Sequence, residues 1–287
     1  MATIVKLVQG SPEWLVYRRT MRNASETPAV LGISPWVTPY QLWLVKTGRS
    51  TQATNEAMIH GTQMEPEARA AYEAQTGQIM NPLVLQDGAY SASLDGITLA
   101  GDLILEVKCP FRGRQSKLWK EVKDGKAPPY YQAQVQHQLM VSGASTAHLW
   151  VYAEAEGMLL TLSRDDAAME AIRAAWDGFQ PYLDGDTPPP LTEADSVLRE
   201  DVAWMEAAKA FTEAKKASEA ADERLEQARR CLVDLSNNPR ETGAGVSVVR
   251  LWKAGNVDYK KVPELVGVDL DRYRAKGREE VRVTVVN

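Results

Sequence analysis

The alternation of apolar and polar residues predicts a mixed order of helices and strands over about residues 1–185. Ser11-Pro12 predicts a helix start, because a serine side chain caps free amide groups and proline suits the first helical position. Thr38-Pro39 repeats that signal. Apolar residues recur every three or four positions between residues 61 and 77, which predicts an amphipathic helix that carries Glu65 one position off its apolar stripe.

Two short apolar runs predict a β-hairpin in the middle of this region. They cover residues 93–97 and 103–109, and Ala100-Gly101 lies between them at the expected turn. The pattern here repeats every two residues, which is typical of strands and not of helices.

The hairpin brings three chemically important side chains together. A turn centred on Ala100 and Gly101 places Asp95 opposite Glu106 on one face. Lys108 shares the face of Glu106, because strand side chains repeat every two residues, and Val107 points to the other face. We therefore expect two carboxylates and one ammonium group to meet at this hairpin.

A proline-rich segment predicts the domain boundary. We expect one domain over residues 1–185, a linker over residues 186–192 and an extension over residues 193–287. The extension contains no glycine or proline from residue 193 to residue 235, and its apolar residues predict one long amphipathic helix or a broken pair.

The last part of the extension predicts a small β structure. Residues 245–251 and 281–286 have the pattern of short strands that flank a turn and a small helix. Nothing in residues 193–287 indicates chemistry, so the expected role of this extension is packing or assembly.

The composition narrows the class of protein. The chain has 287 residues, 44% of them hydrophobic, and a net charge of −5, which is typical of a globular protein. No apolar stretch is long enough for a membrane helix, so we expect no membrane partner and a cytoplasmic location. The two cysteines are far apart, so a metal would be held mainly by oxygen atoms.

Two clusters of cations stand out against the acidic net charge. Seven lysines and arginines lie between residues 108 and 126, against two acidic residues. Arg112, Arg114 and Lys117 in this cluster are candidate DNA-binding residues, because affinity for phosphate depends largely on such cations. Arg18, Arg19 and Arg22 form the second cluster. A run of charges taken alone is usually a solvated face, so these clusters support DNA binding only in combination with a reaction centre.

The hairpin has the chemistry of phosphodiester hydrolysis. A carboxylate pair in an apolar strand environment is costly unless a cation compensates it. Asp95 and Glu106 offer the hard oxygen ligands that Mg²⁺ prefers, and Lys108 could orient water or stabilise charge on a phosphate. The spacing alone leaves open an ordinary Glu–Lys pair at the rim of a hairpin.

A series of motifs decides between these alternatives. They occur in order over about residues 10–150, and together they resemble the lambda exonuclease and YqaJ-type viral recombinase family of the PD-(D/E)xK nuclease superfamily. The motifs are Gly10-Ser-Pro-Glu-Trp14, Ala24-Ser25-Glu26, Leu31-Gly-Ile-Ser-Pro-Trp36, Gly61 with Glu65-Pro66, Ser93-Leu-Asp-Gly96, Glu106-Val-Lys-Cys-Pro110 and Tyr131-Gln-Ala-Gln-Val-Gln136.

The resemblance implies a fold and a set of site residues. The fold is α/β, with a restriction-endonuclease-like core in which helices flank a mixed central sheet, followed here by a long C-terminal helix and a small β appendage. The implied site residues fall into three groups. They are Asp95, Glu106 and the Val107 carbonyl as metal ligands; Lys108, Glu65 and Gln134 as further catalytic residues; and Arg18, Ser25 and Ser93 as ligands of a 5′-phosphate.

The resemblance also implies an activity. Members of the family use Mg²⁺, for which Mn²⁺ substitutes, to degrade one strand of linear double-stranded DNA from its 5′ end. They release mononucleotides and leave a 3′ single strand for a single-strand annealing recombinase, and they form a ring-shaped homotrimer. We expect the same of this chain, together with a phage or prophage origin and a bacterial host cell. An endonuclease of the same superfamily and a catalytically silent DNA-end-binding module are the alternatives.

Two features depart from the family pattern. Leu94 precedes Asp95 where a proline often stands, a change at a backbone position that should leave the carboxylate in place. The segment beyond about residue 190 has no counterpart in the short members of the family, so the assembly state does not carry over simply.

Overall fold

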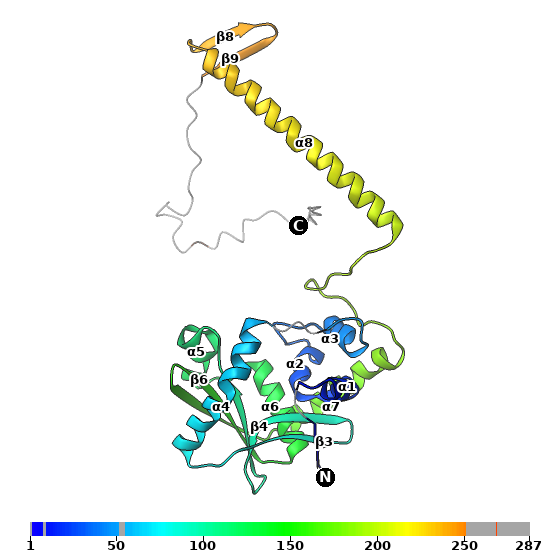
Figure 1. Cartoon of the computed structure of the whole chain (residues 1–287), viewed down its shortest axis with the longest axis vertical. Helices are drawn as coiled ribbons and strands as arrows, with labels where there is room; N and C mark the ends of the chain where they lie inside the picture. Colours follow the sequence, from blue (N-terminus) through cyan, green and yellow to red (C-terminus); the bar gives the residue numbers. More distant parts are fainter. Residues whose placement is uncertain (1, 8–9, 52–54, 251–267, 269–287) are drawn as a thin grey trace. The chain divides into compact units, whose positions relative to one another are not determined.

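The computed structural model describes residues 2–7, 10–51, 55–250 and 268. The chain divides into two compact units, Met1–Ser196 and Val197–Asn287. Figure 1 shows the helices and strands of both. No helix within the described ranges is long and apolar enough to cross a membrane.

A mixed sheet forms the centre of the first unit (Figure 1). Its path runs β1-β3-β4-β5-β6-β7, and β2 adds to β4. The β5–β6 and β2–β4 pairs are parallel and the others are antiparallel. The strands are β1 Thr3–Ile4, β2 Arg22–Asn23, β3 Asn81–Asp87, β4 Tyr90–Ile97, β5 Leu103–Lys108, β6 Thr146–Ala153 and β7 Glu156–Ser163.

Helices cover both faces of this sheet. The helices are α1 Pro12–Thr20, α2 Thr27–Val30, α3 Pro39–Lys46, α4 Glu56–Thr76, α5 Lys117–Lys123, α6 Pro129–Ser142 and α7 Asp166–Asp184, with short 3-10 turns η1 Ala24–Glu26 and η2 Gly113–Gln115. The α2, α3, α6 and α7 helices share one apolar cluster with β4, and α4 packs on β5 and β6 in another. This arrangement confirms the predicted α/β class with a mixed central sheet.

The predicted helix starts are confirmed, and their local chemistry explains them. The Ser11 hydroxyl accepts a hydrogen bond from the Trp14 amide, and Pro12 is the first residue of α1. Thr38 and Gln41 form a reciprocal capping box at α3. The α4 helix begins at Glu56, earlier than predicted, because the Asn55 side chain caps it there and Gly61 is tolerated inside.

The second unit contains a long helix and a hairpin. The α8 helix spans Val202–Leu235 behind an Asp201 cap, so the predicted long helix is confirmed with a later start. The β9 strand, Val246–Val249, lies in the predicted range and pairs with β8, Arg240–Gly243. The other predicted strand, residues 281–286, lies outside the described residues.

Candidate active site

The predicted hairpin register is confirmed where β4 meets β5. Gly96 pairs with Leu105 and Ile97 with Ile104, the register that sets Asp95 opposite Glu106. The ladder stops at Gly96, and the two strands separate from there on. The Val107 amide donates to Asp95 Oδ2 at 2.7 Å in place of a ladder hydrogen bond.

A β-bulge places Asp95 at this point of separation. Asn81 of β3 faces Ile97 and Leu83 faces Leu94, so Asp95 and Gly96 together stand opposite Pro82 alone. Proline has no amide hydrogen to donate to a ladder, and an extra residue bends its strand. The bulge therefore turns the Asp95 side chain toward β5.

Glu106 lies at the centre of a dense hydrogen-bond network. Only 2% of Glu106 is exposed to solvent. Lys108 Nζ and Gln134 Nε2 both donate to Glu106 Oε1, the latter at 2.6 Å. Gln138 Nε2 donates to Oε2 at 2.5 Å. These three hydrogen bonds hold the buried carboxylate in one orientation and offset the cost of taking it out of water.

The charges of the site act on one another. Burial, then the charges of Glu106 and Glu65, raise the pKa of Asp95 well above its ordinary value, although Lys108 opposes this effect. Burial lowers the pKa of Lys108, but Glu106, Tyr131 and Asp95 more than offset it, so that pKa is raised. Lys108 therefore stays an ammonium group beside two acidic side chains.

Glu65 reaches the site from α4 through a residue that sequence reasoning missed. Arg69 Nη1 donates to Glu65 Oε1 at 3.1 Å and to the main-chain oxygen of Asp95 at 2.8 Å. Arg69 thus ties α4 to the bulge and holds Glu65 near Asp95. Its position one helical turn after Glu65 was the available signal.

Gln138 is the second residue that the sequence did not reveal. It is fully buried, and its side-chain nitrogen bridges Glu106 and the main-chain oxygen of Ser93, at 3.1 Å from the latter. Gln134 and Gln138 lie one turn apart on α6, so they face the same carboxylate. The glutamine-rich run of α6 gave no way to separate this residue from its neighbours.

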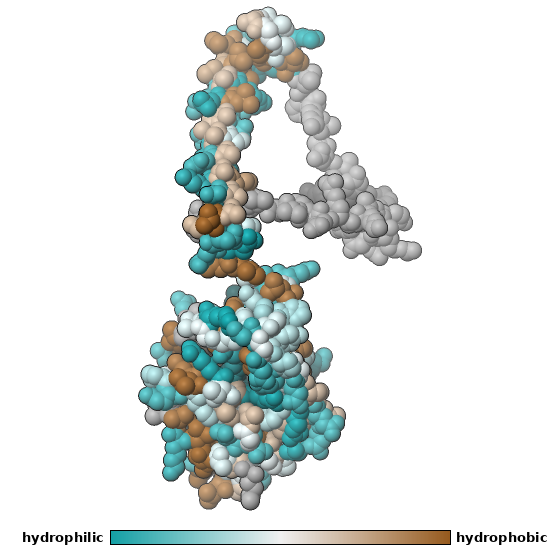
Figure 2. Space-filling model, turned by 90° about the vertical axis from the view of Figure 1, so that its right-hand side faces the viewer, coloured by the Kyte–Doolittle hydropathy of each residue, from teal (hydrophilic) through white to brown (hydrophobic). Residues whose placement is uncertain are grey.

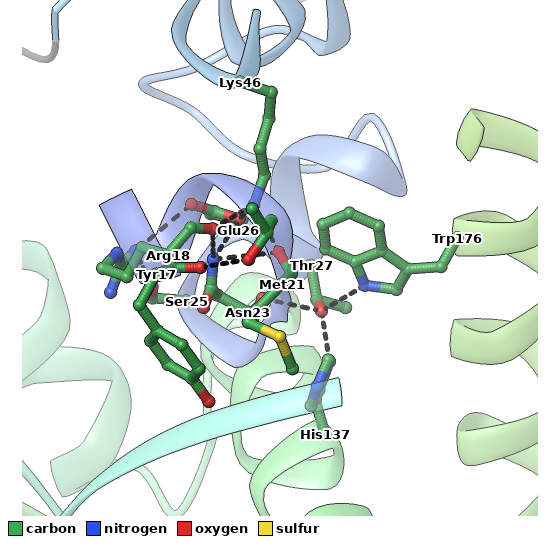
Figure 3. Close-up of polar contacts among 11 residues, drawn as sticks. Tyr17, Arg18, Met21, Asn23, Ser25, Glu26, Thr27, Lys46, His137 and Trp176 are labelled. Atoms are coloured by element: carbon green, nitrogen blue, oxygen red, sulfur yellow. Dashed lines mark hydrogen bonds and ion pairs between the residues drawn. The ribbon is translucent and has the colours of Figure 1, made fainter. Parts of the chain in front are cut away.

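The predicted phosphate ligands come partly together (Figure 3). Arg18 Nη2 donates to the Ser25 hydroxyl at 3.0 Å and to Glu26 Oε1 at 3.3 Å. Arg18 also lies over the Trp14 ring, 4.7 Å from its centroid. Ser93 is on β4, two residues before Asp95, and only its carbonyl contact with Gln138 connects it to the site among the hydrogen bonds of the described residues.

The other predicted cations are engaged with acidic partners to different degrees. Arg114 pairs with Glu156 at 2.9 Å and with Glu154 at 3.4 Å on the β6–β7 turn. Lys117 is largely exposed and lies 3.5 Å from Glu121. Arg112 directly precedes η2. Their proposed DNA contacts stay a prediction.

The donor set suits a hard divalent cation. Asp95 and Glu106 bring two carboxylates to one place, and their mutual repulsion is what a cation would relieve. Glu106 Oε1 already accepts two hydrogen bonds, whereas Oε2 accepts one and keeps a lone pair. Nowhere in the described ranges do three or more His, Cys, Asp or Glu side chains form a ready-made metal cluster.

Residues 13–145 match the YqaJ-like viral recombinase domain. This YqaJ-like segment contains Arg18, Asp95, Glu106 and Lys108, so the resemblance predicted from the motifs is confirmed.

One curated relative supports the same assignment. The chain is 29% identical over 192 residues to the uncharacterized protein YqaJ of Bacillus subtilis, an alignment that covers 60% of this chain. It spans only 59% of the length of that relative.

Two solved structures share the fold of 62% of this chain. The alkaline exonuclease LHK-Exo from Laribacter hongkongensis matches with a TM-score of 0.52 and 26% identity, over 62% of this chain and 94% of that chain. LHK-Exo in complex with dAMP matches over the same shares, with a TM-score of 0.53 and 24% identity. The predicted nuclease fold is therefore confirmed.

Proposed function

We propose that this chain is a divalent-metal-dependent exonuclease that degrades one strand of linear double-stranded DNA from its 5′ end. The observation that carries the proposal is the meeting of Asp95, Glu106 and Lys108 where β4 and β5 separate. The likeness to an alkaline exonuclease at 26% identity supports the reaction class. Its products would be mononucleotides and a 3′ single strand.

The residues of the site would divide the chemistry of hydrolysis among them. Water attacks phosphorus, and the bond to the O3′ atom of the terminal nucleotide breaks. Asp95, Glu106 and the Val107 carbonyl would hold Mg²⁺ or Mn²⁺, which when bound stabilises charge on the phosphate and acidifies water. The Lys108 ammonium group would orient the water and stabilise the charge that develops on the phosphate.

The surrounding residues would keep this centre in place. Gln134 and Gln138 fix the Glu106 carboxylate, and Arg69 fixes Glu65 beside Asp95. Fixed orientation matters because a reacting group misplaced by about 1 Å can cost roughly 100-fold in rate.

Arg18, Ser25 and Ser93 would bind the 5′-phosphate of the strand that is cut. A guanidinium group can make a forked contact with phosphate, and hydroxyl groups can donate to its other oxygens. Each cleavage leaves a new 5′-phosphate, so the pocket would hold the substrate again after every step. Arg18→Ala should therefore abolish the preference for phosphorylated over unphosphorylated ends, and an unchanged preference would rule out this pocket.

We place the reaction in the cytoplasm of a bacterial host, in phage-type recombination in which a single-strand annealing protein takes up the 3′ strand. A homotrimeric ring would keep the enzyme on its duplex. Arg112, Arg114 and Lys117 would contact the DNA backbone, where a lysine or arginine releases counterions.

Digestion of one linear duplex, labelled at the 5′ or the 3′ end of the same strand, tests the proposal. With Mg²⁺ we expect early release of the 5′ label as a mononucleotide and late release of the 3′ label. EDTA or Lys108→Ala should abolish both, whereas Lys123→Ala, at an exposed lysine of α5, should not. A Lys108→Ala variant that cuts as fast as the unaltered protein would refute the assignment.

Two further outcomes identify the alternatives. Cutting of closed circular DNA would indicate an endonuclease. Tight binding of duplex ends without any cleavage, in Mg²⁺ or Mn²⁺, would indicate a silent end-binding module.

A further inference from the structure

An exposed tryptophan lies close to the proposed reaction centre. Trp36 is in the bend between α2 and α3, and 64% of it is exposed. The Ser34 hydroxyl accepts hydrogen bonds from the amides of Trp36 and Val37, both at 3.2 Å, which fixes the bend. A large aromatic ring held open to water at a fixed place offers a large, rigid contact area to a partner ring.

Two tyrosines at the start of α6 brace this ring. Trp36 meets Tyr130 edge to face, with centroids 4.9 Å apart and an angle of 76°. Tyr131 lies 6.1 Å from Trp36 and 4.6 Å from Tyr130. An edge-to-face contact occupies one side of the tryptophan and leaves ring surface free to stack on another ring.

The aromatic group connects directly to the catalytic lysine. Lys108 Nζ lies 5.0 Å from the centroid of the Tyr131 ring. Successive nucleotides of a duplex strand are about 3.4 Å apart along the axis. Trp36 is therefore within a few nucleotides of any phosphate that contacts Lys108.

We propose that Trp36, braced by Tyr130, stacks on a nucleobase of the DNA end within a few nucleotides of the linkage that is cut. This inference rests on the proposed function for its substrate. Every base has a π-face, so such a stack holds DNA without choosing a sequence. It would hold the DNA end in place between two cuts.

Binding of duplexes with abasic residues tests the stack. We would measure affinity for 5′-phosphorylated duplexes with Ca²⁺ in place of Mg²⁺, with a tetrahydrofuran residue at each of the first four positions of either strand. Trp36→Ala should weaken binding of the intact duplex about 5- to 150-fold, the range for loss of one base–aromatic stack. When the base that stacks on Trp36 is the one removed, Trp36→Ala and the unaltered protein should bind that abasic duplex with equal affinity.

Two controls separate stacking from folding. Trp36→Phe keeps an aromatic ring and should retain most of the affinity, whereas Ile79→Ala, at another exposed apolar residue, should change nothing. Undiminished binding by Trp36→Ala, or an equal loss on every abasic duplex, would overturn the proposal. The affinity measurement does not depend on cleavage. A protein that does not cut DNA would therefore refute the proposed nuclease, while the binding data would still decide whether Trp36 stacks on a base.

The α8 helix is exposed to solvent along its whole length. None of the 34 residues of this helix is buried, and Leu225 is 68% exposed. Figure 2 shows apolar side chains at the surface along it. Two series of residues repeat every seven positions, as the core positions of a coiled coil do. The first series is Trp204, Phe211, Ser218, Leu225 and Leu232, and the second is Ala207, Ala214, Ala221, Ala228 and Leu235.

The two series fit each other in an antiparallel pair. Four of the five residues in the second series are alanine, whereas four of the five in the first are large. Antiparallel pairing centred between Ser218 and Ala221 sets each residue of one series against one of the other. Most layers then combine a large and a small side chain. In a parallel pair Trp204 would face Trp204 of the other helix, and Ala207 would face Ala207. The tryptophan layer would then be overpacked and the alanine layer would contain a gap.

The flanking charges favour the same orientation. In the antiparallel register Lys215 of each helix lies beside Asp222 of the other. In a parallel pair Arg224 would lie beside Arg229 of the other helix, and like charges repel. We infer that α8 pairs with α8 of a second copy as an antiparallel coiled coil. Such a pair has twofold symmetry, so if the first unit forms a threefold ring, α8 joins two rings.

Light scattering of the full chain tests this pairing. The unaltered protein should contain an even number of copies. Lys215→Asp and Asp222→Lys alone each set like charges together, and should lower the mass at a given concentration or raise the dissociation constant at least several-fold. The double exchange restores opposite charges and should restore the assembly. The unaltered protein, both single variants and the double variant having the same mass would overturn the pairing. That result would also be expected if residues 251–287 of the same chain, and not a second copy, covered α8.

The orientation has its own measurement. A spin label on Cys231, which is exposed, in a Cys109→Ala background should report a distance of about 35 Å between copies, from a rise of about 1.5 Å per residue. A parallel pair would bring the two labels within roughly 20 Å and refute the antiparallel arrangement.

Discussion

Lys46 reaches from the end of α3 to place its ammonium nitrogen 2.6 Å from Glu26 Oε2 (Figure 3). Glu26 uses its other oxygen to accept from Arg18, and Oε2 also accepts from Asn23 at 2.8 Å. Burial lowers the pKa of Lys46, and Glu26 opposes that effect. The orientation of Arg18, and with it the proposed phosphate pocket, therefore depends on a buried ion pair.

Replacing Lys46 alone should destabilise the protein more than replacing Lys46 and Glu26 together. Lys46→Met removes the cation from Glu26 Oε2 and leaves only the longer Arg18 contact at 3.3 Å. We expect a loss of about 3 kcal/mol in the free energy of unfolding, because a largely buried carboxylate that loses its main cation is costly. The double variant Glu26→Gln with Lys46→Met should recover part of that loss. Chemical denaturation measures all three proteins, and a single variant that costs under about 1 kcal/mol would contradict the pairing.

Gln138 should tune the metal site through Glu106. Gln138→Leu removes the donor to Glu106 Oε2, and we expect activity or apparent Mg²⁺ affinity to fall about 10- to 100-fold, as for other residues that hold metal ligands. Gln132→Leu, on an exposed position of the same helix, is the matched control. A magnesium titration of nuclease activity distinguishes them, and equal curves for both variants would exclude the role.

His137 should make stability depend on pH. It is fully buried, with Nδ1 2.6 Å from the Thr27 hydroxyl, and burial followed by the charge of Arg173 lowers its pKa to about 3. The unfolded chain binds a proton near pH 6.5 while the folded chain does not, so stability falls with decreasing pH between these values. The slope should be about 1.4 kcal/mol per pH unit.

Denaturation between pH 7 and pH 5 measures this slope, since carboxyl groups of ordinary pKa titrate below that range. The raised pKa of Asp95 affects the unaltered protein and the His137→Asn variant alike. His137→Asn keeps a polar group near Thr27 and removes the titration, so its stability should vary less with pH than that of the unaltered protein. Parallel curves for the two proteins would show that His137 does not contribute.

Gly157 should tolerate no side chain. A Cβ atom there would lie 1.8 Å from Cζ2 of Trp150, a buried ring whose Nε1 donates to the main-chain oxygen of Ala68 at 2.9 Å. Gly157→Ala should cost about 1–3 kcal/mol, the range for overpacking. Gly178→Ala on α7 meets open space and should be neutral or stabilising. Thermal melting compares the two, and similar melting points would contradict this packing.

Local sequence features were enough to predict much of the fold. The caps at Ser11 and Thr38 and the register of the β4–β5 hairpin depend on neighbours in the sequence, so periodicity and turn chemistry were enough to predict them. The motif series added the fold class, which the mixed sheet confirms.

Contacts between distant segments escaped prediction for a physical reason. The Asp95 bulge arises opposite Pro82 of another strand, and Gln138 reaches Glu106 from a helix more than thirty residues later. Neither contact leaves a periodic trace, because a single side chain meets a single partner only after the sheet and helices have packed.

By itself, the sequence determined which acidic and basic groups this protein brings to one hairpin, since strand geometry links Asp95, Glu106 and Lys108 over a few residues. Only the tertiary structure decided how they are held, through Arg69, Gln138 and the Lys46–Glu26 pair. Burial makes these contacts strong, and burial is a property of the packed chain.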